Sequence, residues 1–99
     1  MTFSPILKIN KTMLRPRRSA SFKKDYKKLS KAKDITKLDA IIKKLCNEIP
    51  LEPKNKDHEL HHNWVGHREC HVEPDWLLIY KKESDSIVFV RSGSHSELF

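Results

Sequence analysis

The stretch His71–Tyr80, HVEPDWLLIY, decides the fold. Its second half, Trp76–Tyr80, is a short run of apolar and aromatic residues, which is typical of a strand buried on both faces. The Pro74–Asp75 pair just before it is typical of a turn. His71 and Asp75 therefore lie where this strand begins. We expect a functional site there, built from polar side chains on rigid backbone.

The residues around this stretch predict two further strands. Polar and apolar residues alternate from His67 to Glu73, which places Cys70 on the core face of a strand and His71 on the open face. After the buried strand over residues 76–82 and a polar turn, residues 87–90 predict the last strand. Three consecutive strands joined by short turns indicate an antiparallel meander.

A pair of helices in the N-terminal half is predicted to cover this sheet. The first helix follows a short edge strand over residues 13–18 and an N-cap at Ser19 or Ser21. The second begins at Asp34, carries apolar residues every three or four positions and ends before Pro50. Helices followed by strands predict an α+β fold, with an N-terminal helical hairpin packed on a small, mainly antiparallel sheet.

The positive charge of the chain is concentrated in its N-terminal half. Of a formal net charge of +7, residues 1–45 hold 14 Lys and Arg against three acids, whereas residues 46–99 hold six against ten. Cationic side chains at phosphates release counterions, so such a half suits nucleic acid or a ribonucleoprotein; a well-solvated lysine surface is the alternative. The lysines that we expect to face an RNA backbone lie on the first helix: Lys23, Lys24, Lys27 and Lys28.

Length and composition predict one cytoplasmic domain with no membrane segment. The 99 residues suffice for a single core, and no apolar run approaches the roughly 20 residues of a membrane span. Neither a secretory signal nor a disulfide framework is evident, so Cys46 and Cys70 are expected to be buried free thiols in a reducing compartment. Residues 1–12 lack any sustained period and predict a disordered extension, with the domain itself over residues 13–99.

The histidines crowd into a short part of the chain, but their spacing argues against a metal site. No CxxC motif occurs, and no HExxH motif lies in a helical segment. On a strand, His67 and His71 share a face yet stand roughly 13 Å apart, at about 3.3 Å per residue. We therefore expect neither a metal nor another cofactor.

The same residue types suit RNA cleavage without a metal. Attack by the 2′-hydroxyl of the RNA needs a base, an acid for the leaving 5′-oxygen and cations at the phosphate. Histidine serves as acid or base near neutral pH, arginine grips two phosphate oxygens, and an aromatic ring stacks on an unpaired base. The candidates are His58, His71, His95, Asp75, Arg68, Arg91, Trp76 and Phe99.

These residues carry a resemblance to a known family. The segment Lys56–Phe99 resembles the C-terminal half of YafQ-type toxins, which belong to the RelE/ParE superfamily of bacterial toxin–antitoxin systems. The shared motifs are K-D-H, W-x-G-x-R, H-V-E-P-D-W-x-L-I-Y, R-x-G-[ST]-H and a terminal L-F. An N-terminal S-x-x-F-K-K-D-Y-K-K extends the resemblance to about residues 13–99. The combination of HVEPDWLLIY with the downstream GSH is specific, whereas the single histidines are not.

The resemblance implies a RelE-like fold and a ribosome-dependent endoribonuclease that cuts mRNA without metal. It also implies silencing by a cognate antitoxin in a hetero-oligomer, and ribosomal RNA as the partner of the lysine-rich helix. Two alternatives stay open: a ParE-like or degenerate toxin that acts on a protein target, and a basic RNA-binding module. The resemblance implies catalytic roles for His58, His71, Asp75 and His95 (with His95 as general acid), aromatic positions linked to activity at Trp76 and Phe99, and phosphate contacts from Arg68 and Arg91.

Overall fold

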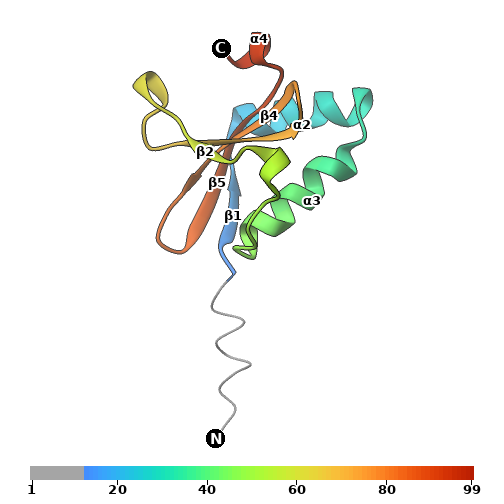
Figure 1. Ribbon diagram of the computed structural model, residues 1–99. Coiled ribbons are helices and arrows are strands. Elements are labelled where there is room, and N and C mark those ends of the chain that lie inside the picture. The colour runs from blue at the N-terminus through green and yellow to red at the C-terminus, as the bar shows by residue number, and fades with distance from the viewer. Residues whose placement is uncertain (1–12) are drawn as a thin grey trace, which may run out of the picture.

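The computed structural model describes residues 13–99 and confirms the α+β architecture (Figure 1). The extension expected over residues 1–12 lies outside the described residues. Two helices precede the main strands, and a short helix closes the chain. The elements are β1 (Arg15–Arg18), α2 (Ala20–Ala32), α3 (Ile35–Cys46), the 3-10 turn η1 (Pro53–Asn55), β2 (His58–Glu59), the 3-10 turn η2 (His62–Trp64), β3 (Arg68–Glu73), β4 (Trp76–Lys82), β5 (Ser86–Gly93) and α4 (His95–Leu98).

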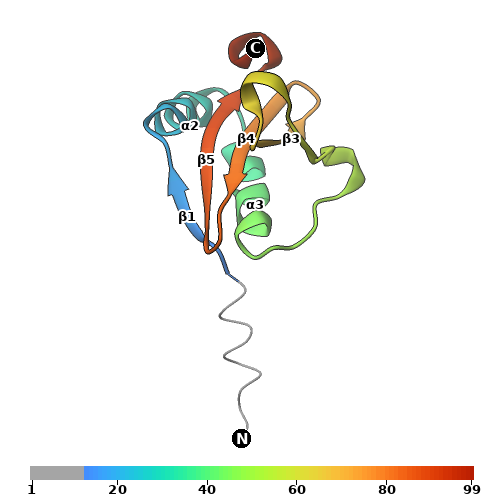
Figure 2. The ribbon, with the colours of Figure 1, turned by 90° about the vertical axis from the view of Figure 1, so that its left-hand side faces the viewer.

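The sheet has β4 at its centre and follows the order β1-β5-β4-β3-β2. Strands β3, β4 and β5 form the predicted antiparallel meander, and β1 joins β5 as a parallel edge strand. Every residue from Trp76 to Tyr80 is at most 1% exposed, so the prediction of a strand buried on both faces is confirmed. Figure 2 looks onto the face of the sheet opposite α3.

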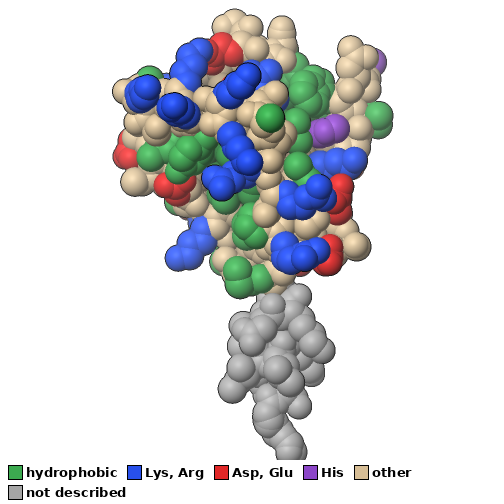
Figure 3. Space-filling model, turned by 180° about the vertical axis from the view of Figure 1, so that it is seen from behind, with side chains coloured by type: hydrophobic (Ala, Val, Ile, Leu, Met, Phe, Trp, Pro, Cys, Tyr) green, Lys and Arg blue, Asp and Glu red, His purple; other side chains and the backbone are tan. Residues whose placement is uncertain are grey.

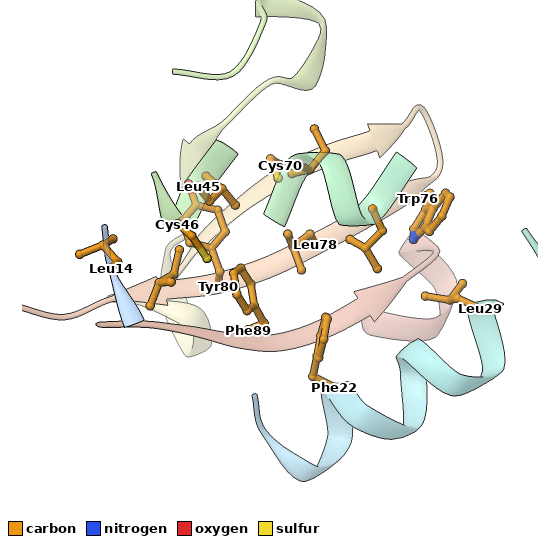
Figure 4. Packing of buried hydrophobic residues seen from close by; sticks show 13 residues of the cluster. Leu14, Phe22, Leu29, Leu45, Cys46, Cys70, Trp76, Leu78, Tyr80 and Phe89 are labelled. Atoms are coloured by element: carbon orange, nitrogen blue, oxygen red, sulfur yellow. The ribbon is translucent and has the colours of Figure 1, made fainter. Parts of the chain in front are cut away.

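Helices α2 and α3 cover one face of the sheet and form the larger core with it (Figure 4). Ser19 caps α2, because its hydroxyl accepts a hydrogen bond from the backbone N–H of Phe22 at 2.9 Å. The Asp34 carboxylate caps α3 in the same way, through the N–H of Thr36. Phe22 and Leu38 are completely buried, which confirms the apolar stripes of both helices as core.

The opposite face is closed in part by α4, a helix that the sequence did not lead us to expect. Leu98 packs there on Leu77 and Ile79 of β4. The Ser94 hydroxyl accepts from the N–H of Glu97, and the Glu97 carboxylate accepts from the N–H of Ser94 at 2.8 Å. The Ser94 N–H, followed by the ammonium group of Lys28, lowers the pKa of Glu97 from 4.5 to about 2. The capping box fixes the chain next to His95.

Two element boundaries differ from the sequence-based prediction. Helix α3 ends at Cys46 instead of before Pro50, because Glu48 takes a left-handed conformation with φ of 55°. Ile49 is consequently 50% exposed and does not belong to the core stripe. Strand β5 extends to Gly93 because pairing with β4 continues as far as Leu77.

Both cysteines are buried and free, as predicted. None of the helices in residues 13–99 combines the length and the apolar character that crossing a membrane requires.

Candidate active site

Three of the predicted catalytic side chains lie together at the start of β4. His71 comes from β3, Asp75 from the turn between β3 and β4, and His95 from the first residue of α4. The rings of His71 and His95 meet edge to face, with their centroids 5.7 Å apart. The structure therefore brings His95 next to His71, which lies 24 positions earlier in the sequence.

Asp75 fixes the orientation of the His95 ring. Its Oδ1 accepts hydrogen bonds from the backbone N–H of His95 at 3.0 Å and from His95 Nδ1 at 2.6 Å. The backbone N–H is the main cause that holds the pKa of Asp75 below its ordinary value, and the ring is the second. Because the Nδ1 proton points at a carboxylate, the Nε2 atom of His95 remains free to exchange a proton with substrate. The imidazole is also 54% exposed, so substrate can reach it.

We expect Asp75 to remain ionised to a more acidic pH than an ordinary aspartate. A carboxyl whose pKa is lowered on folding stabilises the protein above the pKa of the unfolded chain, and this contribution is lost as the pH falls through the folded value. An NMR titration of the Asp75 carboxyl carbon should give a pKa below 3.8. His95→Ala should keep part of the shift, because the backbone N–H of residue 95 is retained. A pKa at or above 3.8 in the wild type would contradict the pairing.

A second carboxylate, that of Glu69, lies between His58 and His71. Its Oε1 is 3.5 Å from Nε2 of His58 and 3.6 Å from Nε2 of His71. Both rings are oriented by backbone carbonyls, since Nδ1 of His58 lies 2.6 Å from the oxygen of Lys56 and Nδ1 of His71 lies 3.2 Å from that of Pro74. A carbonyl oxygen only accepts, so each Nδ1 carries a proton and each Nε2 is directed at Glu69.

Glu69 is a site residue that the sequence reasoning missed. Alternation placed it on the open face beside His71, where a solvated carboxylate was the natural interpretation. The structure instead buries it to 5% exposure, because β2 pairs alongside and places His58 opposite it. The one signal available in the sequence was its position two residues before His71 on the same strand face.

Glu69, His58 and His71 lie close enough together that their geometry can be compared with that of a metal site. Their separations of 3.5 and 3.6 Å exceed hydrogen-bond length and approach the roughly 3.4 Å between neighbouring ligands of a tetrahedral ion. In residues 13–99, however, no group of three His, Cys, Asp or Glu side chains has the arrangement of a complete metal site. Both distances are measured to the same atom, Oε1 of Glu69, so they show two imidazoles around one oxygen. They do not show three ligand atoms arranged around a common metal position.

The structure places Arg68 apart from the other predicted site residues. Its side chain lies on the helix-covered side of the sheet, where Nε donates to Asp57 Oδ1 at 3.2 Å, close to Tyr80 and Leu45. Alternation along β3 explains this placement, because Arg68 and Cys70 share the face opposite to that of His71. Arg68 is therefore separated by the sheet from the candidate active site.

Arg91 is partly engaged by α2. Its Nε and Nη2 donate to the two carboxylate oxygens of Asp25 at 2.7 and 3.2 Å, and the N–H of Ser92 donates to the same carboxylate at 3.0 Å. The Arg91 side chain is 32% exposed. Within residues 13–99 its Nη1 edge makes no side-chain hydrogen bond, which leaves one edge available for a phosphate oxygen.

The two predicted aromatic residues have different surroundings. Trp76 is 1% exposed inside the larger core (Figure 4), and its Nε1–H donates to the buried Ser92 hydroxyl at 3.1 Å. A ring this buried offers no face to a base, which corrects the expectation that Trp76 contacts RNA. Phe99 is 58% exposed and meets Trp64 edge to face at 6.1 Å. Both line a cavity of about 650 Å³ that also reaches His58.

Exposed lysines run along α2, as predicted. Lys23, Lys24 and Lys27 are exposed and form no ion pair with any other residue in 13–99. Lys28 differs, since its Nζ lies 2.9 Å from Glu97 Oε2 of α4. In Figure 3, Lys and Arg side chains are scattered over the visible face, among apolar and some acidic side chains. Lys23, Lys24 and Lys27 therefore give α2 a positively charged surface. The Lys28–Glu97 pair places α2 beside α4, the helix that begins at His95.

Comparison with known proteins places this arrangement in a family. A family model described as a bacterial toxin of type II toxin–antitoxin system, YafQ, matches residues 14–99. The mRNA interferase toxin YafQ of Escherichia coli strain B is 45% identical over 83 residues, covering 82% of this chain and 90% of that protein.

Solved structures agree with this assignment. A crystal structure of the E. coli DinJ–YafQ toxin–antitoxin complex matches with a TM-score of 0.81 and 40% identity over 88% of this chain and 98% of the other. A structure described as a metal-bound toxin from Helicobacter pylori matches with a TM-score of 0.82 and 43% identity over 88% and 100% of the two chains. The present chain therefore belongs to the YafQ family of bacterial toxins of type II toxin–antitoxin systems.

Proposed function

We propose that this chain is an mRNA interferase: a toxin that cuts ribosome-bound messenger RNA by acid–base catalysis, with the 2′-hydroxyl of the RNA as nucleophile. The observation that carries the proposal is a chain of three histidines, each oriented through its Nδ1 atom: His95 lies against His71, and His71 shares the Glu69 carboxylate with His58. This leaves Nε2 of His95 for proton transfer with substrate, while Nε2 of His58 and Nε2 of His71 face the Glu69 carboxylate. Family membership supports the same activity, since the E. coli relative is named an mRNA interferase toxin.

In the proposed mechanism, two imidazoles move the protons. His71, with the Glu69 carboxylate 3.6 Å from its Nε2, takes the proton of the 2′-hydroxyl as that oxygen attacks phosphorus. His95 gives the proton of its Nε2–H to the 5′-oxygen as the bond from phosphorus to that oxygen breaks. The products are a 2′,3′-cyclic phosphate and a 5′-hydroxyl, so atoms and charge balance without a co-reactant. His58 shares Glu69 with His71 and holds the carboxylate in place.

Two further groups complete the proposed site. The open edge of the Arg91 guanidinium neutralises the phosphate as negative charge accumulates on it. The cavity lined by Trp64 and Phe99 takes an unstacked base, since aromatic faces bind any base by stacking. Because this cavity reaches His58, a base held there places its own ribose near the His58 imidazole.

The proposed partners follow from surface charge and from family membership. The exposed lysines of α2 suit the phosphates of ribosomal RNA. A cognate antitoxin is the second partner, as in the DinJ–YafQ complex of the relative. The competing function, a toxin of this fold that only binds a protein target, has no use for acid–base groups held in fixed tautomers.

The proposal is tested by cleavage of a ribosome-bound message with the purified chain. Wild type should cut the message, whereas His71→Ala and His95→Ala should each lose most of the activity. A binding-only toxin would cut nothing in any variant. Because one relative is described as metal-bound, the assay should be repeated with a zinc- and copper-selective chelator that leaves ribosomal Mg²⁺ in place. We expect unchanged cleavage; abolition by the chelator and rescue by the metal would contradict the metal-free mechanism.

Replacing the three unpaired lysines of α2 should weaken ribosome binding without changing the chemistry. For Lys23, Lys24 and Lys27 changed together to Gln, we expect the slope of log affinity against log salt to fall by about two to three, if each lysine contacts one phosphate. The matched control changes three exposed lysines elsewhere: Lys43, Lys54 and Lys81. Equal salt dependence in the two triple variants, measured by ribosome sedimentation, would rule out α2 as the contact surface.

A further inference from the structure

A cluster of polar side chains lies behind His58, on the helix-covered side of the sheet. The Oδ1 atom of Asp57 accepts from the Tyr80 hydroxyl at 2.6 Å and from Arg68 Nε at 3.2 Å. Tyr80 is 1% exposed, and both its burial and this hydrogen bond raise its pKa, so the hydroxyl remains a donor at neutral pH. We refer to Asp57, Arg68 and Tyr80 as the Asp57 cluster. It is distinct from the candidate active site, which occupies the opposite face.

The chain next to this cluster is held in an unusual backbone conformation. Lys56 has φ of 47° and ψ of 48°, in the left-handed region that non-glycine residues adopt only where their surroundings hold them there. On its N-terminal side, the buried Asn55 donates from Nδ2 to the carbonyl of His71 at 2.8 Å. On its C-terminal side stands Asp57. The segment is therefore attached to the sheet on both sides of Lys56.

This attachment decides where the Lys56 carbonyl points. That carbonyl accepts the Nδ1 proton of His58 at 2.6 Å, which leaves Nε2 of the ring directed at Glu69. The strand that carries His58 cannot secure this geometry alone. It is two residues long, and its register consists of two pairs, His58 with Glu69 and Glu59 with Arg68. The side-chain cluster supplies the missing constraint.

We propose that Asp57 and Tyr80 are positioning residues for His58: through the carbonyl of Lys56, they hold its imidazole as the Nδ1–H tautomer. The expected effect on RNA cleavage rests on the proposed function, whereas the expected effect on the His58 tautomer does not. It also gives Arg68 a role, as the second donor to Asp57 instead of a phosphate ligand. In the K-D-H motif, the clamp formed by Asp57 and the Lys56 carbonyl thus precedes His58, the acid–base residue that it orients.

The informative variant is Tyr80→Phe, which removes one hydroxyl and keeps the ring that fills the core. Its matched control is Tyr26→Phe. The Tyr26 hydroxyl donates to Asp39 Oδ1 at the same distance of 2.6 Å, between α2 and α3 and away from His58. For Tyr80→Phe we expect kcat on ribosome-bound message to fall about tenfold to a hundredfold with KM unchanged. Tyr26→Phe should match wild type in both.

Imidazole ¹⁵N shifts of His58 in the free protein provide a readout that needs no RNA. Wild type and Tyr26→Phe should show a single tautomer protonated on Nδ1, whereas Tyr80→Phe and Asp57→Asn should show both tautomers in exchange. In a His58→Ala background, Tyr80→Phe should cause no further loss of kcat. An unchanged His58 tautomer in both cluster variants overturns the inference. If wild type fails to cleave RNA, the proposed function is wrong, and the tautomer measurement still decides whether the clamp exists.

Discussion

His95→Ala is expected to lower kcat for message cleavage by about 10²- to 10⁴-fold, which is the usual contribution of a general acid. The expectation rests on the Asp75 carboxylate, which binds Nδ1 of His95 at 2.6 Å and leaves Nε2 for the leaving oxygen. Alanine removes that proton donor but retains the backbone N–H of residue 95, which donates to the Asp75 carboxylate.

Stability should change little in this variant, because the His95 imidazole is 54% exposed and fills no part of the core. Single-turnover cleavage on ribosomes measures the chemical step directly, and KM should stay near the wild-type value because the acid acts in the transition state. The neighbouring Ser96→Ala variant is the control for any disturbance of α4. Wild-type kcat in His95→Ala would show that another group protonates the leaving oxygen.

Trp76→Ala is expected to cost about 3–5 kcal/mol of folding free energy, because it empties a large site in the core. The indole is 1% exposed, and its Nε1–H is the donor to the buried hydroxyl of Ser92. Ser92 in turn donates to the carbonyl of Leu77 at 2.7 Å, so the indole links the start of β4 to the end of β5. Since total stability for such domains is about 5–15 kcal/mol, this one change removes a large part of it.

The comparison with Phe99→Ala separates a core role from an RNA-binding role. Phe99 is 58% exposed, so its removal should change the free energy of unfolding by less than about 1 kcal/mol while weakening message binding. Urea denaturation of Trp76→Ala and Phe99→Ala measures the difference between their free energies of unfolding. Unchanged stability in Trp76→Ala, together with weakened RNA binding, would contradict the burial of Trp76 and restore it as a base-stacking residue.

Local patterns predicted most of the fold. The apolar run in β4, the alternation in β3 and the caps Ser19 and Asp34 each reflect physics that acts within a few residues, so they are legible in one sequence. Helix α4 was missed because four residues are too few to show a period. The capping box of Ser94 and Glu97 was its one local signal.

The site was less predictable because its geometry depends on pairing across the sheet. His71, Asp75 and His95 were identified by residue type and by motif, and the structure places them together. Two pairings had no local signature. The burial of Glu69 depends on β2 lying alongside β3, and the engagement of Arg68 depends on Asp57 lying behind the sheet.

Trp76 illustrates a limit of reading roles from motifs. It belongs to the strand that carries the resemblance, and a position linked to activity is easily taken for a point of RNA contact. In the structure the ring supports the β4–β5 pairing beside Asp75 and reaches no surface. A buried residue of this kind affects activity through the geometry of its neighbours.

The most direct test of the central claim is cleavage of a message in which one 2′-hydroxyl, on the nucleotide 5′ to the mapped cut, is replaced by hydrogen. If that hydroxyl is the nucleophile, cleavage by the wild-type chain on intact ribosomes should disappear at that bond, while the fully hydroxylated message is cut as before. Cleavage of the deoxy-substituted bond at an undiminished rate would show that water attacks the phosphate, and would contradict the account.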